Sequence, residues 1–241
     1  MLLDLKKINK VYKLKIIGVI HIGAHLGQEY SAYVDLGIED MAFFEPQQDL
    51  FQQLAQKIPQ SSNIKLYNLA LGNEVCEKVM HIDSYNQASS SILKPKIHLT
   101  QHPHIKFEKK ITVNMDKLDN VIKSKKYNFI NIDVQGFELE VFKGAEKILN
   151  DIDYILAEVN RDEVYEDCTK VEELDEFLLK YNFIRIETNW AGKTWGDAFY
   201  IKVDEAIKSK NKPQIKRILK GKNEFNLFYK SFCKIKQIFQ K

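Results

Sequence analysis

A short segment near the start of the chain has the order of a buried strand, a glycine turn, a helix and a second strand that ends in an acid. The apolar run 16–22 is followed by Gly23 and Gly27, and Glu45 ends the next apolar run. Strand, turn, helix and strand in this order form the opening unit of a parallel sheet covered by helices. A carboxylate at a strand tip can accept hydrogen bonds from two ribose hydroxyls. The segment therefore predicts an α/β fold with a nucleoside site at the carboxyl edge of its sheet.

The spacing of the two glycines indicates which nucleoside ligand fits. Gly23 and Gly27 lack the tighter Gly-x-Gly-x-x-Gly pattern that brings a helix N-terminus onto a pyrophosphate. This weakens the case for NAD and favours a ligand without phosphates, with S-adenosylmethionine (SAM) as the leading candidate. Two plainer interpretations stay open. The glycines can simply form a tight turn before a helix, and Glu45 can simply place a negative charge at a helix N-terminus beside Pro46.

Apolar runs alternate with helical patterns along most of the chain, which predicts repeated βα units in one domain, residues 1–204. Residues 1–15 are expected to form a short helical lead-in. The expected strands are 16–22, 41–45, 64–70, 129–133, 154–159, 183–188 and 198–202, with 76–82 as an added strand or hairpin. The expected helices are 29–36, 49–58, 115–123, 138–150 and 171–181. Between residues 83 and 110 we expect a long loop of the kind that serves as a lid or binding segment.

Composition places the chain among globular proteins. Of its 241 residues 44% are hydrophobic and 29% charged, and no apolar run approaches the roughly 20 residues of a membrane span. The three cysteines are far apart and include no Cys-x-x-Cys pair, which favours a reducing compartment over a disulfide framework or a zinc ribbon. The N-terminal residues alternate charges with apolar residues too often for a signal peptide. We therefore expect a cytoplasmic protein.

The charge is distributed unevenly. Residues 205–241 hold eleven lysines and arginines against two acids, a net charge of +9 within a chain total of +3, so residues 1–204 carry −6. Aromatic and aliphatic residues of this segment fall on one helical face. The segment is expected to pack on the domain or on a second subunit, or to lie peripherally on the anionic inner face of a membrane. Nucleic-acid binding by this segment is the remaining, weaker alternative, since a basic stripe with aromatic residues is also a nucleic-acid signature. The acidic balance of residues 1–204 does not suit the phosphate backbone that an RNA methyltransferase would bind.

A second motif lies at the fourth expected strand. The apolar run ends in Asp133, turns at Gly136 and enters a helix with Glu138 and Glu140 in its first turn. Acids in the first turn of a helix complement the helix dipole. This structural role is enough to explain Glu140, and it remains an alternative explanation for Asp133 and Glu138. Asp133 lies at the strand tip, where open α/β sheets bind ligands, so we expect it in the ligand crevice.

These motifs together resemble a known family. The resemblance rests on the ordered set His21-Ile-Gly-Ala-His-Leu-Gly-Gln-Glu29, Phe44-Glu-Pro46, Ala70-Leu-Gly72, Ser89-Ser-Ser-Ile-Leu93, Leu118-Asp119, Ile132-Asp-Val-Gln-Gly-Phe-Glu138, Lys143-Gly-Ala145, Glu158-Val-Asn160 and Gly196-Asp-Ala198. The set is similar to the FkbM family of SAM-dependent methyltransferases over about residues 16–202. It implies a Rossmann-like class I methyltransferase fold, a seven-stranded, mostly parallel sheet of order 3-2-1-4-5-7-6, and methyl transfer to a hydroxyl of a sugar or natural product.

The resemblance also implies the residues that hold the cofactor. Gly23, Ala24 and Gly27 would line the methionine portion of SAM, Glu45 would hold the ribose, and Ala70 and Leu71 would lie near the adenine. The full expected set is His21, Gly23, Ala24, His25, Gly27, Glu29, Glu45, Pro46, Ala70, Leu71, Ser90, Asp133 and Gln135. His21 and His25 stand where many members carry Asp and Asn, which leaves open the partner of the methionine amine.

Methyl transfer to a hydroxyl benefits from a base within hydrogen-bond reach of the acceptor. Asp133 is the first choice for this role, followed by Glu158. Ser91, Asn160, Arg161, Trp190 and Asp197 are the expected acceptor contacts. Trp190, Trp195 and Tyr165 flank the expected crevice, where they would stack on a sugar ring or simply pack in the core.

Three histidines, His98, His102 and His104, invite further hypotheses. His-x-x-x-His is a metal-ligand spacing on a helix, but Pro103 argues against a continuous helix, so no metal is predicted. A base or substrate-contacting histidine and ordinary loop histidines stay open. For the whole chain the leading hypothesis is a SAM-dependent O-methyltransferase acting on a glycan or small polyhydroxylated acceptor. A nucleoside-binding module without catalysis and an RNA methyltransferase are the alternatives.

Overall fold

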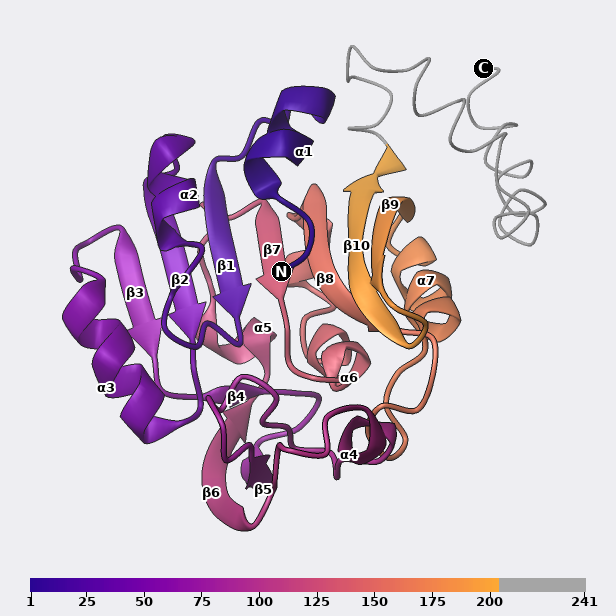
Figure 1. Cartoon of the computed structure of the whole chain (residues 1–241). Helices are drawn as coiled ribbons and strands as arrows, with labels where there is room; N and C mark the ends of the chain where they lie inside the picture. Colours follow the sequence, from indigo (N-terminus) through magenta and orange to yellow (C-terminus); the bar gives the residue numbers. More distant parts are fainter. Residues whose placement is uncertain (204–241) are drawn as a thin grey trace.

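The fold is built on a central sheet of seven strands. The computed structural model describes residues 1–203, so the predicted tail 205–241 lies outside the described residues. The strands are β1 (Gly18–Ile22), β2 (Asp40–Phe44), β3 (Ile64–Tyr67), β7 (Phe129–Ile132), β8 (Tyr154–Asn160), β9 (Phe183–Ala191) and β10 (Trp195–Lys202). Their order in space is β3-β2-β1-β7-β8-β10-β9 (Figure 1). Only β10 runs against its neighbours, pairing antiparallel with both β8 and β9. Numbered along the chain, this is the predicted order 3-2-1-4-5-7-6.

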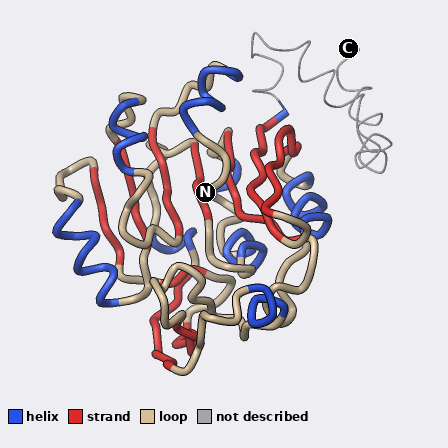
Figure 2. Tube along the Cα trace, viewed as in Figure 1, coloured by secondary structure: helices blue, strands red, loops and turns tan. Residues whose placement is uncertain are grey.

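Helices cover both faces of the sheet (Figure 2). One face packs against α1 (Leu5–Tyr12), α2 (Tyr30–Asp35) and α3 (Gln48–Lys57), and the other against α5 (Leu118–Val121), α6 (Glu138–Lys143) and α7 (Val171–Leu179). Because side chains alternate along a strand, Phe43 packs into the first layer and Phe44 into the second. Both faces are apolar, which explains why the strands read as continuous hydrophobic runs. Within residues 1–203 no helix is long and apolar enough to cross a membrane.

A small second sheet lies beyond the carboxyl ends of the parallel strands (Figure 1). Its strands are β4 (Ala70–Leu71), β5 (Cys76–Ile82) and β6 (Lys109–Asp116), in the order β4-β6-β5. The added strand 76–82 was predicted, but the expected strand 64–70 is divided between β3 and β4. The expectation of a loop up to residue 110 and a helix from 115 was wrong, because β6 occupies 109–116 and the helix is limited to α5. Only Val113 and Met115 of β6 are buried, so its apolar pattern is weak.

Two further segments differ from expectation. The predicted loop 83–110 contains the short helix α4 (Ile97–Gln101), and the backbone N–H groups of Lys96 and His98 donate to the carbonyl of Val164 at 3.0 and 3.2 Å. The segment is thereby tied to the chain that follows β8. The predicted helix 138–150 divides into α6 and the 3-10 turn η1 (Ile148–Asn150). It breaks at Gly144, where a Cβ atom would lie 1.9 Å from the carbonyl oxygen of Gly72.

Candidate active site

The glycine turn after β1 brings the two sequence motifs together. Gly23 has φ +77°, and a Cβ atom there would lie 1.9 Å from the carbonyl oxygen of Asp133. The N–H groups of Gly23 and Ala24 donate to the carbonyl of Phe44 at 3.0 and 2.9 Å. The turn therefore packs directly on the residue after β7 and is anchored to the end of β2. Only a residue without a side chain permits this approach.

Glu45 follows β2 and is held by backbone donors. It is 3% exposed, and its two carboxylate oxygens accept hydrogen bonds from the N–H groups of His25 at 2.8 Å and Gln47 at 2.9 Å. Burial raises the pKa of this carboxyl, while the two N–H groups act in the opposite direction. The carboxylate thus faces the glycine turn at the predicted strand tip, with Gln47 capping α3 beside it.

A pocket opens at this edge of the sheet, with about 570 Å³ of empty space. Its apolar wall includes Ala70, Leu71, Met80 and Phe137. The predicted cofactor residues in its lining are Gly23, His25, Glu45, Pro46, Ala70, Leu71, Ser90, Asp133 and Gln135. His21, Ala24, Gly27 and Glu29 are not in the lining; His21 and Ala24 are buried, and Glu29 is the N-cap residue of α2. We call this cavity the donor pocket.

A second pocket adjoins the first, with about 750 Å³ of empty space. Ala88, Asp133 and Gln135 line both cavities, so the two share a wall. The remaining lining residues are Met1, Leu2, Ser89, His98, Gln101, His102, Glu158, Val164, Trp195 and Asp197. Among these described residues there is no lysine or arginine. We call this cavity the acceptor pocket.

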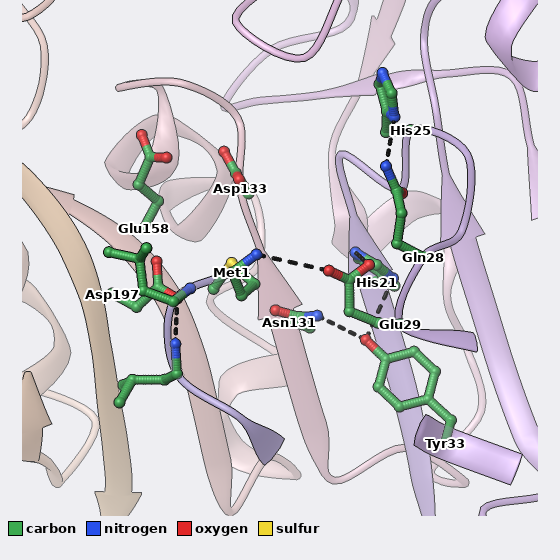
Figure 3. A network of polar contacts seen from close by, with 12 residues as sticks. Met1, His21, His25, Gln28, Glu29, Tyr33, Asn131, Asp133, Glu158 and Asp197 are labelled. Carbon is green, nitrogen blue, oxygen red and sulfur yellow. Dashed lines mark hydrogen bonds and ion pairs between the residues drawn. The ribbon is translucent and has the colours of Figure 1, made fainter. Parts of the chain in front are cut away.

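One glutamine connects the acids at the shared wall. The Nε2 atom of Gln135 donates to Asp133 Oδ1 at 2.7 Å and to Glu158 Oε2 at 2.9 Å. Its Oε1 atom lies 2.7 Å from the hydroxyl of Tyr165, which is also 2.8 Å from the carbonyl oxygen of Ser89. Burial raises the pKa of both carboxyls, and for Glu158 the charges of Asp133, Glu138 and Asp197 add to the increase. Figure 3 shows the two carboxyl groups beside each other.

The expected acceptor residues are only partly in the acceptor pocket. Asp197 lines it, is 1% exposed and has no partner for Oδ1 within the described residues. Its Oδ2 atom accepts from the N–H groups of Leu2 and Leu3, and burial raises its pKa to about 6. Trp195 and His98 also line this cavity, and Nδ1 of His98 has no hydrogen-bond partner within residues 1–203.

The other expected acceptor residues lie outside both pockets. The hydroxyl of Ser91 donates to the carbonyl of Gln135 at 2.9 Å, so it holds the backbone of the shared wall without lining either pocket. Asn160 is buried at the end of β8. Arg161 stacks on Trp190, with its guanidinium carbon 3.7 Å from the ring centroid. Ser91, Asn160, Arg161 and Trp190 are therefore not placed as direct contacts of a ligand in either cavity.

His21 belongs to a buried network beneath the turn (Figure 3). Its Nδ1 atom lies 3.2 Å from the hydroxyl of Tyr33, which accepts a hydrogen bond from Asn131 at 2.6 Å. Its Nε2 atom lies 3.9 Å from Glu29, whose other oxygen is 3.7 Å from the α-ammonium group of Met1. Burial lowers the pKa of His21 to about 4, so the ring is neutral near pH 7.

His25 has a different role in the geometry. Its side chain leaves the turn and bridges Gln28, 2.8 Å from Nδ1, and the carbonyl of Asn86, 2.9 Å from Nε2. The ring thereby ties the glycine turn to the segment 86–90, which carries Ala88 and Ser90 into the donor pocket. The sequence named His25 as a cofactor residue but did not indicate this bridging contact.

The rings of the three loop histidines contact each other, tilted for one pair and edge to face for the other. Ring centroids are 4.9 Å apart for His98 and His102, and 6.1 Å for His102 and His104. Across residues 1–203 no group of three or more His, Cys, Asp or Glu side chains has the arrangement of a metal site. Burial lowers the pKa of His98 to about 4, so this ring is also neutral near pH 7.

The sheet order, the glycine turn after β1 and the acid after β2 together define the class I methyltransferase fold. Comparison with known proteins gives the family. The family described as the methyltransferase FkbM domain matches residues 21–185, so the chain belongs to this family, as its sequence motifs predicted, and is a methyltransferase.

Individual relatives are distant. The 2-O-methyltransferase NoeI of Sinorhizobium fredii (strain NBRC 101917 / NGR234) is 22% identical over 176 residues, which make up 69% of this chain and 72% of the relative. Among solved structures, Sp1610 of Streptococcus pneumoniae, described as a putative tRNA (m1A22) methyltransferase, is 9% identical over 84% of this chain and 71% of that chain, with a TM-score of 0.46. TrmK of M. capricolum, solved with S-adenosylhomocysteine (SAH), is 10% identical over 84% of this chain and 70% of that chain, with a TM-score of 0.42.

Proposed function

We propose that the chain transfers a methyl group from SAM to a hydroxyl of a sugar, glycan or small polyhydroxylated acceptor. The observation that carries the proposal is the shared wall between the two pockets, where Asp133 and Gln135 face both cavities. In-line displacement needs donor and acceptor to meet across a short gap. A wall of this kind places one carboxylate beside the meeting point.

The donor pocket has the features that an adenosine ligand requires. Glu45 supplies carboxylate oxygens for ribose hydroxyls, and the Oε1 atom of Gln47 is buried in the lining without a partner among the described residues. Gly23 lines the same pocket, at a position where any Cβ atom would collide with the carbonyl oxygen of Asp133. Ala70, Leu71 and Phe137 offer apolar surface for a base. When bound, SAM supplies an activated methyl group on a sulfonium sulfur.

The lining of the acceptor pocket favours a hydroxyl-rich acceptor without negative charge. Asp133, Glu158 and Asp197 offer carboxylate oxygens to hydroxyl donors and outnumber the α-ammonium group of Met1, and no lysine or arginine of the described residues joins that group to hold a phosphate or carboxylate. The lining therefore supports a sugar or polyol over an RNA substrate. The printed name of NoeI, a 2-O-methyltransferase, is in line with transfer to oxygen.

Within this proposal, Asp133 is the base that accepts the proton of the acceptor hydroxyl, and Gln135 orients its carboxylate. Glu158 lies across the same amide and contributes a second carboxylate. Tyr165 holds Gln135 in place through Oε1. The acceptor hydroxyl is a poor nucleophile, so removal of a positioned base typically costs about 10²-fold to 10⁴-fold in rate.

The test uses Asp133→Asn, because asparagine keeps the shape of the side chain but removes its basicity. We expect SAH formation with extracted surface glycan as acceptor to fall at least about 100-fold. Asp151→Asn, an exposed change of the same kind outside both pockets, is the control and should act like the unaltered chain. Near-normal turnover of Asp133→Asn would remove Asp133 as the base. Absence of any SAH formation by the unaltered chain, despite SAM binding, would favour the binding module without catalysis.

A further inference from the structure

Among residues 1–203 no lysine or arginine side chain lies against the pair of carboxyls at the shared wall. Asp133 and Glu158 each place one oxygen within hydrogen-bond distance of the same nitrogen, Gln135 Nε2, at 2.7 and 2.9 Å. Glu158 is only 5% exposed, and Asp133 is open only in part. An amide supplies a dipole but no charge. Two ionised carboxylates sharing one buried donor repel each other, and such pairs hold a proton to higher pH than either acid alone.

The surroundings of the pair come from five elements or loops and are mostly acidic. The groups that face it are Glu29 before α2, Glu138 on α6, Asp197 on β10, the hydroxyl of Tyr165 and the α-ammonium group of Met1. Burial is the largest cause of the raised pKa of Asp133 and of Glu158, and the neighbouring acids increase it for Glu158. Near neutral pH the pair is therefore short of positive charge.

A second observation shows that the site is built to receive a ligand. Asp197, 1% exposed, lines the acceptor pocket beside Glu158 with its Oδ1 atom unpartnered among the described residues. A buried carboxylate oxygen without a donor costs free energy unless a ligand supplies one. Ala88, Asp133 and Gln135 line both pockets, so the charged sulfur of a methyl donor in the first pocket must face this wall to reach the second.

We propose that Asp133 and Glu158 share one proton in the ligand-free protein and release it when the sulfonium group binds, so that the pair favours the methyl donor over its neutral product. This inference rests on the function proposed above. A cation beside the pair stabilises the fully ionised state. That state is also the one in which Asp133 can accept a proton from the acceptor hydroxyl. Once the sulfur is neutral, the pair takes up a proton again and the product loses its electrostatic attraction.

Isothermal titration calorimetry with SAM and with SAH tests the proposal without any acceptor. Both ligands carry the same adenosine, ammonium and carboxylate groups, so the difference between them isolates the sulfonium. Measuring the binding enthalpy in buffers of different ionisation enthalpy gives the number of protons released. We expect SAM to release up to about one proton more than SAH near neutral pH. The ratio of SAH to SAM dissociation constants should rise with pH by at most about tenfold per unit.

The matched variants are Glu158→Gln and Asp133→Asn, each of which leaves a single carboxyl that has no partner with which to share a proton. In both, the extra proton release with SAM should vanish and the SAH-to-SAM ratio should lose its pH dependence. Glu172→Gln, at an exposed position on α7, is the control and should retain both properties. Thermal melting followed by circular dichroism identifies any variant that does not fold. If neither variant folds, the difference in proton release between SAM and SAH binding to the unaltered chain tests the inference. Equal proton release with SAM and SAH overturns the inference, whereas failure of SAM to bind overturns the proposed function instead.

Discussion

At the scale of single residues, the contact between Gly23 and Asp133 explains why the turn tolerates no side chain. Gly23 and Gly37 have similar backbone angles, φ +77° and +73°, but a Cβ atom at Gly37 would meet nothing within 4 Å. The two positions therefore separate the cost of a left-handed backbone from the cost of a steric clash. Asp133 is also the residue proposed as base, so the same clash would displace the catalytic carboxylate.

We expect Gly37→Ala to lower the free energy of unfolding by about 1 kcal/mol, the cost of a left-handed alanine. Gly23→Ala should lower it by about 3 kcal/mol or more, because its Cβ atom would lie 1.9 Å from a backbone oxygen that cannot move independently of β7. Urea denaturation followed by circular dichroism measures both, and calorimetry should show weakened SAM binding for Gly23→Ala alone. Equal losses for the two variants would mean that the clash is relieved by a small backbone shift.

The sequence located Glu45 and Asp133 because both follow apolar strands, and strand tips meet at one edge of a parallel sheet. It did not place Ala88 or Gln101 in the acceptor pocket, and it only left open a substrate contact for His98, because they lie in the irregular segment 83–110. His98 is held by a backbone hydrogen bond to Val164 and Gln101 by a side-chain hydrogen bond to Thr194, both far away along the chain. It also assigned Arg161 and Trp190 to the acceptor, whereas they stack on each other outside both pockets.

At the scale of elements, α7 is fastened to β9 by a buried ion pair. Asp175 and Arg185 are 3% and 7% exposed, and three hydrogen bonds of 2.8 to 3.1 Å join them. Burial raises the pKa of Asp175, and the guanidinium opposes the increase. Neither residue lines the donor pocket or the acceptor pocket, so we assign the pair a role in stability.

We expect Asp175→Ala to lower the free energy of unfolding by about 3 to 5 kcal/mol, because it leaves the Arg185 guanidinium without its carboxylate in a buried place. Replacing both residues by apolar ones, Asp175→Leu with Arg185→Met, should recover most of that loss. Glu140→Ala removes the exposed pair with Lys143 and should cost less than about 1 kcal/mol. Urea denaturation of the four proteins gives the comparison. If the double variant is as unstable as Asp175→Ala, the expectation is wrong. The ion pair then stabilises the fold by more than the mutual neutralisation of its two charges.

The elements of the main sheet were predictable because strands buried on both faces leave long apolar runs. The elements of the small sheet were harder to predict. In β6 only two of eight residues are buried, and the strand is defined by pairing with β5 at one side and β4 at the other. The division of 138–150 into two parts coincides with the close approach of Gly144 to Gly72, a tertiary contact that the glycine in the sequence does not by itself reveal.

At the scale of the whole molecule, charge separates the chain into two parts. Residues 1–204 carry −6 and residues 205–241 carry +9, so the two parts respond oppositely to an anionic surface. A lysine or arginine close to an anionic membrane contributes about 1 kcal/mol of attraction. Both pockets lie within the acidic part and are lined by acids, so we do not expect anionic lipid to be drawn to the site itself.

We therefore expect the full chain to float with vesicles that contain anionic lipid and to be released by salt. The chain cut after residue 204 should not float with these vesicles. The physical reason is that removal of the last segment changes the net charge from +3 to −6. Vesicles of neutral lipid are the control, and circular dichroism with SAM titration verifies that the shortened chain is folded. Equal flotation of both chains would exclude the basic segment as a membrane contact. Sedimentation of both chains without lipid then tests whether the segment joins two subunits. If it does, its removal converts the dimer to a monomer, whereas a segment that only contacts the membrane leaves the number of subunits unchanged.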